Sequence, residues 1–172
     1  MKLSSVAAIL RVLNAAEVRA LVVGGLAVNA HGYIRFTKDA DLAVELVPQN
    51  IERAFAALAG LGYRPRVPIT AAQFADPVMR ESWIREKEMK VLQFASDAHR
   101  ETPIGVFVIE PFNFEEEYER AFSAAIELPG EEPTVARYVA IPALIKMKEA
   151  VGRIQDLDDV QHLRWIEEER RA

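Results

Sequence analysis

The chain has 172 residues, of which 51% are hydrophobic and 27% charged, and this length and composition are typical of one soluble globular domain. It contains no cysteine, which excludes disulfide scaffolds, thiolate zinc sites and thiol catalysis. The 26 acidic and 21 basic residues give a net charge of −5, which argues against a broad basic surface for nucleic acid. No apolar stretch approaches the ~20 residues that span a bilayer. We therefore expect a cytoplasmic protein.

The first third of the chain alternates between helix and strand patterns. Apolar residues recur at helical spacing near the N-terminus, which predicts an amphipathic first helix. A short β-branched strand over 21–23 then runs into Gly24-Gly25. The following segments are a short helix over 26–31 that stops at Gly32, a strand over 37–46, and a helix that begins at Pro48 and is closed by Gly60 and Gly62.

The rest of the chain continues this alternation and ends in helices. The expected segments are a loop with some helix over 70–86, strands over 87–94 and 104–109, a helix over 114–124, a short strand or loop over 126–128, a surface turn over 130–132, a helix from 142 to 151, and a last helix capped by Asp156 that runs to about 168. This order predicts an α/β (α+β) fold: a small mixed β-sheet flanked by helices, with a helical C-terminus. We expect a single domain over 1–172, with a core over about 20–128 and a C-terminal helical part over about 140–168.

Gly24 and Gly25 form the first candidate site. They lie between a buried strand and a helix. Glycines allow a ligand to approach the backbone closely, and the helix N-terminus offers unpaired N–H groups that suit the phosphates of a nucleoside triphosphate. A double glycine is also a common tight turn, so this motif has little weight alone.

Asp39 and Asp41 form the second candidate site. On a strand their carboxylates project from one face, together with Thr37. Two neighbouring like charges are unfavourable unless cations neutralise them, and Mg²⁺ (or Mn²⁺) takes carboxylate oxygens in phosphoryl and nucleotidyl transfer. A solvated strand edge is the alternative interpretation of this pair.

The order of the two motifs resembles that of the minimal nucleotidyltransferases of the polymerase-β-like superfamily, with greatest similarity to the AbiEii/AbiGii-type toxin family. The family pattern GG-x-A-x-x-x-HG-x-x-R-x-T-x-D-x-D is matched in one register by Gly24, Gly25, Ala27, His31, Gly32, Arg35, Thr37, Asp39 and Asp41. The resemblance implies that Asp39 and Asp41 are catalytic metal ligands and that Gly24, Gly25, Arg35 and Thr37 bind the nucleotide. For Arg35, an exposed surface arginine is the alternative.

The C-terminal part also resembles this family. Family members end with a helix that carries a lysine, followed by a helix that opens with R-x-x-(K/R)-D-x-x-D. Here these positions are Lys148, Arg153, Asp156 and Asp159, with Gln155 in place of the usual basic residue. The resemblance implies that Lys148 faces the nucleotide phosphates as a catalytic residue and that Asp156 supports the nucleotide site. A purely structural role for the two aspartates at the start of a helix is the alternative.

One position departs from the family pattern. Active members carry a third carboxylate on a later central strand, and the corresponding residue here is Gly105. Loss of a positioned general base typically costs 10²–10⁴-fold in rate. Glu110 has the opposite strand parity and is a poor replacement, and nothing in the sequence brings Glu88 or Glu101 to the site.

The resemblance thus implies transfer of NMP from an NTP to an acceptor hydroxyl with Mg²⁺. The acceptor (RNA, protein or small molecule) is open, as is a homodimer. A role as the toxin-like component of a toxin–antitoxin or phage-defence pair would add a cognate antitoxin or regulator. The alternative is a catalytically degenerate relative that serves as a nucleotide- or partner-binding module, and Gly105 is the reason to consider it.

Overall fold

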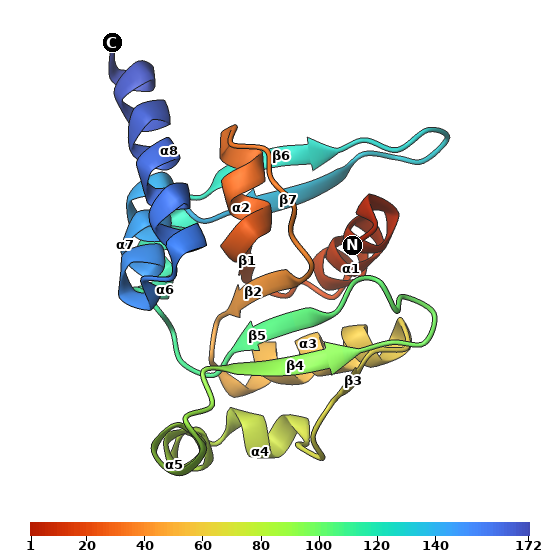
Figure 1. Cartoon of the computed structure of the whole chain (residues 1–172). Coiled ribbons are helices and arrows are strands. Elements are labelled where there is room, and N and C mark those ends of the chain that lie inside the picture. The colour runs from red at the N-terminus through yellow and green to blue at the C-terminus, as the bar shows by residue number, and fades with distance from the viewer.

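The computed structural model describes residues 1–172 and contains eight helices and seven strands (Figure 1). The order is α1 (Leu3–Ala15), β1 (Ala20–Val22), α2 (Gly24–His31), β2 (Ala40–Val44), α3 (Pro48–Gly60), β3 (Arg64–Pro65), α4 (Ala71–Ala75), α5 (Pro77–Lys87), β4 (Val91–Ala95), β5 (Ile104–Phe107), α6 (Phe114–Glu119), β6 (Phe122–Ile126), β7 (Thr134–Tyr138), α7 (Ile141–Val151) and α8 (Ile154–Arg171). None of these helices combines the length and apolar character needed to cross a membrane.

All seven strands form one mixed sheet in the order β3-β4-β5-β2-β1-β7-β6. β2 runs antiparallel to β1 and parallel to β5, and β1 runs parallel to β7. β2 is therefore an inner strand, and residues next to it in space come from both halves of the chain.

The two faces of β2 have different environments because successive side chains alternate. Leu42 and Val44 are buried in the main core, where they pack with residues of α1, α3 and α4. Asp41 points to the opposite face, which α2 covers together with the C-terminal helices (Figure 1). The strand alternation thus places Asp41 beside α2, while Leu42 and Val44 are packed in the core on the other face.

The mixed α/β sheet and the helical C-terminus confirm the predicted fold class, but several boundaries differ. The strand predicted over 37–46 is only Ala40–Val44, so Asp39 precedes it. The segment 87–94 begins as the end of α5, and the strand starts at Val91. The helix predicted over 114–124 ends at Glu119, and β6 takes its last residues.

Two strands and one cap were not predicted. β3 has only two residues, and β7 follows the predicted turn with an alternating pattern whose partners lie on β6 and β1. Asp156 is not the cap of the last helix: Arg153 is the N-cap, and Asp156 is the third helical residue and bonds back to it. Helix periodicity alone does not distinguish these two positions, because an aspartate is favourable at either.

Candidate nucleotide site

Gly24 lies where the first turn of α2 meets Asp41. A Cβ atom at Gly24 would collide with the Asp41 carboxylate. The φ angle of Gly24 is +63°, a left-handed conformation that favours glycine. Glycine is therefore required here by both space and backbone conformation, and the aspartate lies directly at the N-terminus of the helix.

The loop between α2 and β2 folds back over the same helix turn. Asn29 holds it with two hydrogen bonds, donating to the carbonyl of Arg35 (2.9 Å) and accepting from its N–H (3.0 Å). A Cβ atom at Gly25 would stand 2.5 Å from Thr37 Oγ1. The second glycine therefore allows Thr37 to pack directly on the start of α2.

A buried ion network joins this loop to the two C-terminal helices. Asp159, whose side chain is fully buried, accepts two bonds from the Arg35 guanidinium (2.6 and 2.7 Å) and lies 2.8 Å from Lys148 Nζ. Lys148 also donates to Asp156 (3.1 Å), which in turn accepts from Arg153 (2.7 Å). Burial opposes ionisation of Asp156, but its bonds from Arg153 and Lys148 more than offset this, and the net effect lowers its pKa. Arg35 is thus half-buried and paired, which corrects its interpretation as an exposed surface arginine.

Removal of the central carboxylate should destabilise the fold. In Asp159→Asn, Arg35 and Lys148 lose their shared counter-charge in a dry environment, and the expected loss in free energy of unfolding is about 3–5 kcal/mol. The exposed neighbour Asp158 offers a matched control, with an expected change within about 1 kcal/mol for Asp158→Asn. Urea unfolding of both variants measures the difference. Equal losses in the free energy of unfolding would contradict a stabilising role of the Asp159 carboxylate.

The Asp41 carboxyl titrates well above its usual range. Burial raises its pKa, the nearby Asp39 raises it further, and the more distant cations Lys148, Arg153 and Arg35 only partly compensate, which leaves the pKa at about 6. An anionic Asp41 is therefore an unfavourable feature of the metal-free fold at neutral pH.

This shift predicts a pH-dependent effect of Asp41→Asn on stability. Between about pH 4 and 6 the folded protein keeps a proton that the unfolded chain has lost, so the wild type loses stability as the pH rises through this range. The asparagine variant lacks this loss and should be more stable than wild type by about 1–3 kcal/mol above pH 6.5, with no difference near pH 4. Urea unfolding in EDTA from pH 4 to 8 measures it, and a pH-independent difference would contradict the raised pKa.

Gly105 stands at the position where the resembled family carries its third carboxylate, and neighbouring side chains occupy the space around it. Gly105 pairs with Asp41 on one side and with Gln93 of β4 on the other. A Cβ atom there would stand 2.6 Å from Asp41 Oδ1, 2.8 Å from Val91 Cγ1 and 3.3 Å from Gln93 Nε2. An aspartate at this position would therefore displace Asp41. Neither Glu101, which pairs with Lys2, nor Glu110, which bonds the N–H of Leu46, replaces it.

A single methyl group at position 105 should be unfavourable. We expect Gly105→Ala to lower the free energy of unfolding by about 1–3 kcal/mol, because Asp41 and Val91 must move. Gly60 is the matched control, since no atom lies within 4 Å of its Cβ position at the end of α3. Gly60→Ala should be neutral or stabilising by up to about 1 kcal/mol. Thermal or urea unfolding compares the two, and a neutral Gly105→Ala would contradict the tight packing.

The predicted site residues divide into two groups. Gly24, Asp41, Lys148 and Asp156 line one cavity of about 430 Å³, together with Arg153. The other four predicted residues do not line this cavity: Gly25, Arg35, Thr37 and Asp39. They lie beside it, where Thr37 packs on Gly25 and bonds the Asp39 carbonyl, and where Arg35 joins the ion network through Asp159.

Sequence reasoning missed the apolar half of this cavity. Its walls come from α5 and the residues just after it, from the end of β5 and the residues just after it, and from α7, and they include Ile84, Met89, Phe107, Ile109, Leu144, Met147 and Val151. A helical apolar stripe on α7 was visible in the sequence, but it has the same pattern whether a helix faces a core or a cavity.

His31 of the family pattern has a structural role. It lies at the opposite end of α2 from Gly24, is buried, and its Nε2 atom is 2.8 Å from the carbonyl oxygen of Val139. Burial lowers the pKa of its imidazole, which keeps the ring neutral. Lys146, on the neighbouring helix, is exposed, whereas Lys148 is buried and turned inward as predicted.

The donor set fits a cation only in combination with a substrate. No group of three or more histidine, aspartate or glutamate side chains is placed to hold a metal ion. Asp39 and Asp41 supply two carboxylates, and the raised pKa of Asp41 means that a cation would relieve an existing repulsion. Mg²⁺ is commonly held by one or two carboxylates plus substrate phosphates, so the pair fits a metal that arrives with a nucleotide.

The seven-stranded mixed sheet and its helices have the fold of a solved nucleotidyltransferase. The chain is similar to a solved structure of the lincosamide antibiotic adenylyltransferase LnuA with lincomycin bound: the TM-score is 0.54 and the identity 13%, over 92% of this chain and 93% of the other. No known protein-family model and no curated protein matches the sequence. The comparisons support the fold and do not extend to the narrower resemblance to the AbiEii/AbiGii toxins.

Proposed function

We propose that the protein is a Mg²⁺-dependent nucleotidyltransferase, which transfers NMP from an NTP to an acceptor hydroxyl. The observation that carries this proposal is the position of Asp41 against Gly24, at the N-terminus of α2 and in one cavity with Lys148. Backbone N–H groups at a helix N-terminus bind phosphate, and the carboxylate beside them suits the cation that accompanies a triphosphate.

The residues of the site have distinct roles in this proposal. Gly24 and Gly25 bind the β- and γ-phosphates through their backbone, and Lys148 offsets phosphate charge from the cavity wall. Arg35 and Thr37 hold the loop that carries Asp39, and Asp156 holds Lys148 in place. Asp39 and Asp41 would hold Mg²⁺, which supplies electrostatic stabilisation of the charge that develops on the phosphates.

The reaction exchanges one P–O bond for another. The acceptor hydroxyl oxygen attacks the α-phosphorus in line, the bond from the α-phosphorus to the bridging oxygen breaks, and pyrophosphate leaves. Position 105 offers no carboxylate to accept the hydroxyl proton, so this proton passes to solvent. We therefore expect slow transfer compared with a site that has a positioned base, by a factor of about 10²–10⁴.

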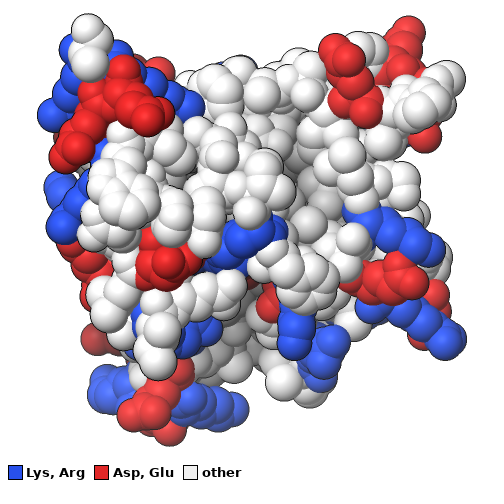
Figure 2. All heavy atoms as spheres, turned by 45° about the horizontal axis from the view of Figure 1, so that its top comes forward, with Lys and Arg blue, Asp and Glu red and all other residues white.

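The cavity walls favour a small acceptor with an apolar body. Phe107, Ile109 and Met147 lie in the same cavity as Asp41, and apolar walls with few polar groups are typical of small-molecule sites. Lysine and arginine side chains are interspersed with acidic ones on the face seen in Figure 2, so this face is not a broad basic surface for RNA. The solved structure of LnuA holds lincomycin, which is consistent with this acceptor class for the fold.

The second candidate is a nucleotide- or partner-binding module without transfer. The absent side chain at position 105 favours it, and two exposed apolar residues on the site loop, Ile34 (78% exposed) and Phe36 (72%), offer a contact for a protein partner such as an antitoxin or a second copy.

Nucleotide binding should raise the melting temperature in a Mg²⁺-dependent way. At a free NTP concentration of about 100 Kd the stabilisation is about 2.7 kcal/mol, which corresponds to roughly 5–10 °C at this chain length. Thermal unfolding with ATP, GTP, CTP and UTP, with Mg²⁺ or EDTA, measures the shift. It should vanish in Asp41→Asn and persist in Asp97→Asn, which removes a fully exposed carboxylate.

Transfer is then tested with the nucleotide that binds, labelled at its α-phosphate. Release of pyrophosphate on addition of hydroxyl acceptors supports the transferase, whereas binding without release supports the module. If no NTP at millimolar concentration raised the melting temperature, the proposal of a nucleotide site would be wrong.

A further inference from the structure

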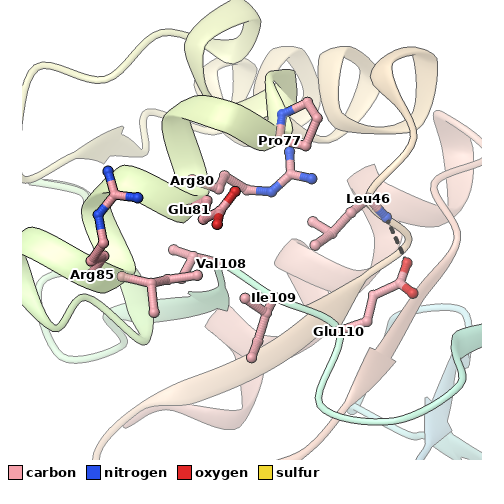
Figure 3. A pocket seen from close by; sticks show the side chains of 9 residues that line it. Leu46, Pro77, Arg80, Glu81, Arg85, Val108, Ile109 and Glu110 are labelled. Atoms are coloured by element: carbon pink, nitrogen blue, oxygen red, sulfur yellow. Dashed lines mark hydrogen bonds between the residues drawn. The ribbon is translucent and has the colours of Figure 1, made fainter.

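A second cavity, of about 510 Å³, lies between α5 and the segment that follows β5 (Figure 3). It shares the apolar wall of Ile84, Val108 and Ile109 with the candidate nucleotide cavity, but Asp41 and Lys148 do not line it. The remaining lining residues are mostly charged: Arg80, Glu81, Arg85 and Glu110, with Leu46 and Pro77.

Arg80 is a buried cation without a carboxylate partner. Only 9% of the residue is exposed, and no acidic oxygen lies within 4 Å of its guanidinium. Its single hydrogen bond goes from Nη1 to the carbonyl oxygen of Phe74 at the end of α4. Since a guanidinium has five N–H donors, most of them have no protein acceptor. Burial lowers the pKa of Arg80, as expected for a desolvated and incompletely paired charge.

Glu110 stands on the opposite wall (Figure 3). Its Oε1 atom accepts the N–H of Leu46 at 3.2 Å, which orients the carboxylate and leaves Oε2 without a protein donor. The charge of Asp76, at the start of α5, and then that of Glu110 raise the pKa of Arg80 and partly offset its burial, although neither carboxylate forms an ion pair with it. The cavity therefore presents the buried Arg80 and the carboxylate of Glu110 on facing walls, with apolar side chains between them and with Glu81 and Arg85 also in its lining.

We propose that this cavity binds a small zwitterion with an apolar side chain, of the class of the apolar α-amino acids. The ligand carboxylate would receive two N–H bonds from Arg80, and its ammonium group would donate to Glu110. Its hydrocarbon part would lie on Ile84, Val108 and Ile109. A carboxylate suits the planar fork of a guanidinium, and pairing of both charges avoids the cost of a lone buried ion.

The site is tested by titration of the full chain with three probes that differ by one charged group. L-Leucine carries both charges, 4-methylpentanoate only the carboxylate, and 3-methylbutylamine only the ammonium. Two-dimensional ¹H–¹⁵N spectra report binding through shifts of the amides around Ile84 and Ile109. We expect saturable shifts with leucine, and at least tenfold weaker binding of each truncated probe, because each loses a charge-assisted pair.

Three variants locate the two contacts. Arg80→Lys keeps the charge but loses the fork, and Glu110→Gln, at an exposed position, removes the anion with little risk to folding. Both should weaken leucine binding about tenfold or more. Arg100→Gln is the matched control, since Arg100 is exposed, pairs with Asp97 and does not line this cavity, and it should change leucine binding less than threefold.

Two outcomes overturn the proposal. The absence of saturable shifts with leucine up to 50 mM would mean that solvent satisfies Arg80. Equal binding of leucine and 4-methylpentanoate, unchanged in Glu110→Gln, would mean that the cavity takes simple carboxylates. The titration contains no nucleotide or Mg²⁺, so its result is independent of whether the neighbouring cavity performs nucleotidyl transfer.

Discussion

The buried Asp159 carboxylate is the interaction on which the candidate nucleotide site depends. It lies between Arg35 of the α2–β2 loop and Lys148 of α7, and so joins three segments that are far apart in the chain. Charges in a dry interior are tolerated only when they are paired and hydrogen-bonded, so each member of this network requires the others. The network therefore holds the C-terminal helices over the sheet and sets one wall of the cavity.

A second constraint acts at the other wall, where Asp41 is packed between two glycines. Side chains at positions 24 and 105 would both occupy the volume of its carboxylate. The glycine of the α2 turn and the glycine of β5 thus have the same physical role: each leaves room for the Asp41 carboxylate. This packing leaves no room for a larger side chain at position 105, because the space that it would need is already filled by Asp41, Val91 and Gln93.

The two cavities share a wall and differ in their charge. The first gathers Asp41, Lys148 and Arg153 around the start of α2, whereas the second presents Arg80 and Glu110 on facing sides. Ile84, Val108 and Ile109 separate them, because these side chains of α5 and of the segment after β5 line both. α5, in a region whose sequence indicated mainly a loop, therefore shapes both cavities.

The sequence by itself determined the class of fold and the aspartate pair that follows a glycine turn, because these follow from local periodicity and from residues close together in the chain. Helix spacing indicated that only one of Lys146 and Lys148 points inward, and the family resemblance favoured Lys148. It also identified position 105 as unusual. The partner of Arg35, the unpaired state of Arg80, the short strand β3 and the apolar cavity walls were decided by the tertiary structure. Each depends on residues tens of positions apart, such as Arg35 and Asp159, and local propensity carries no information on which distant side chain will balance a buried charge.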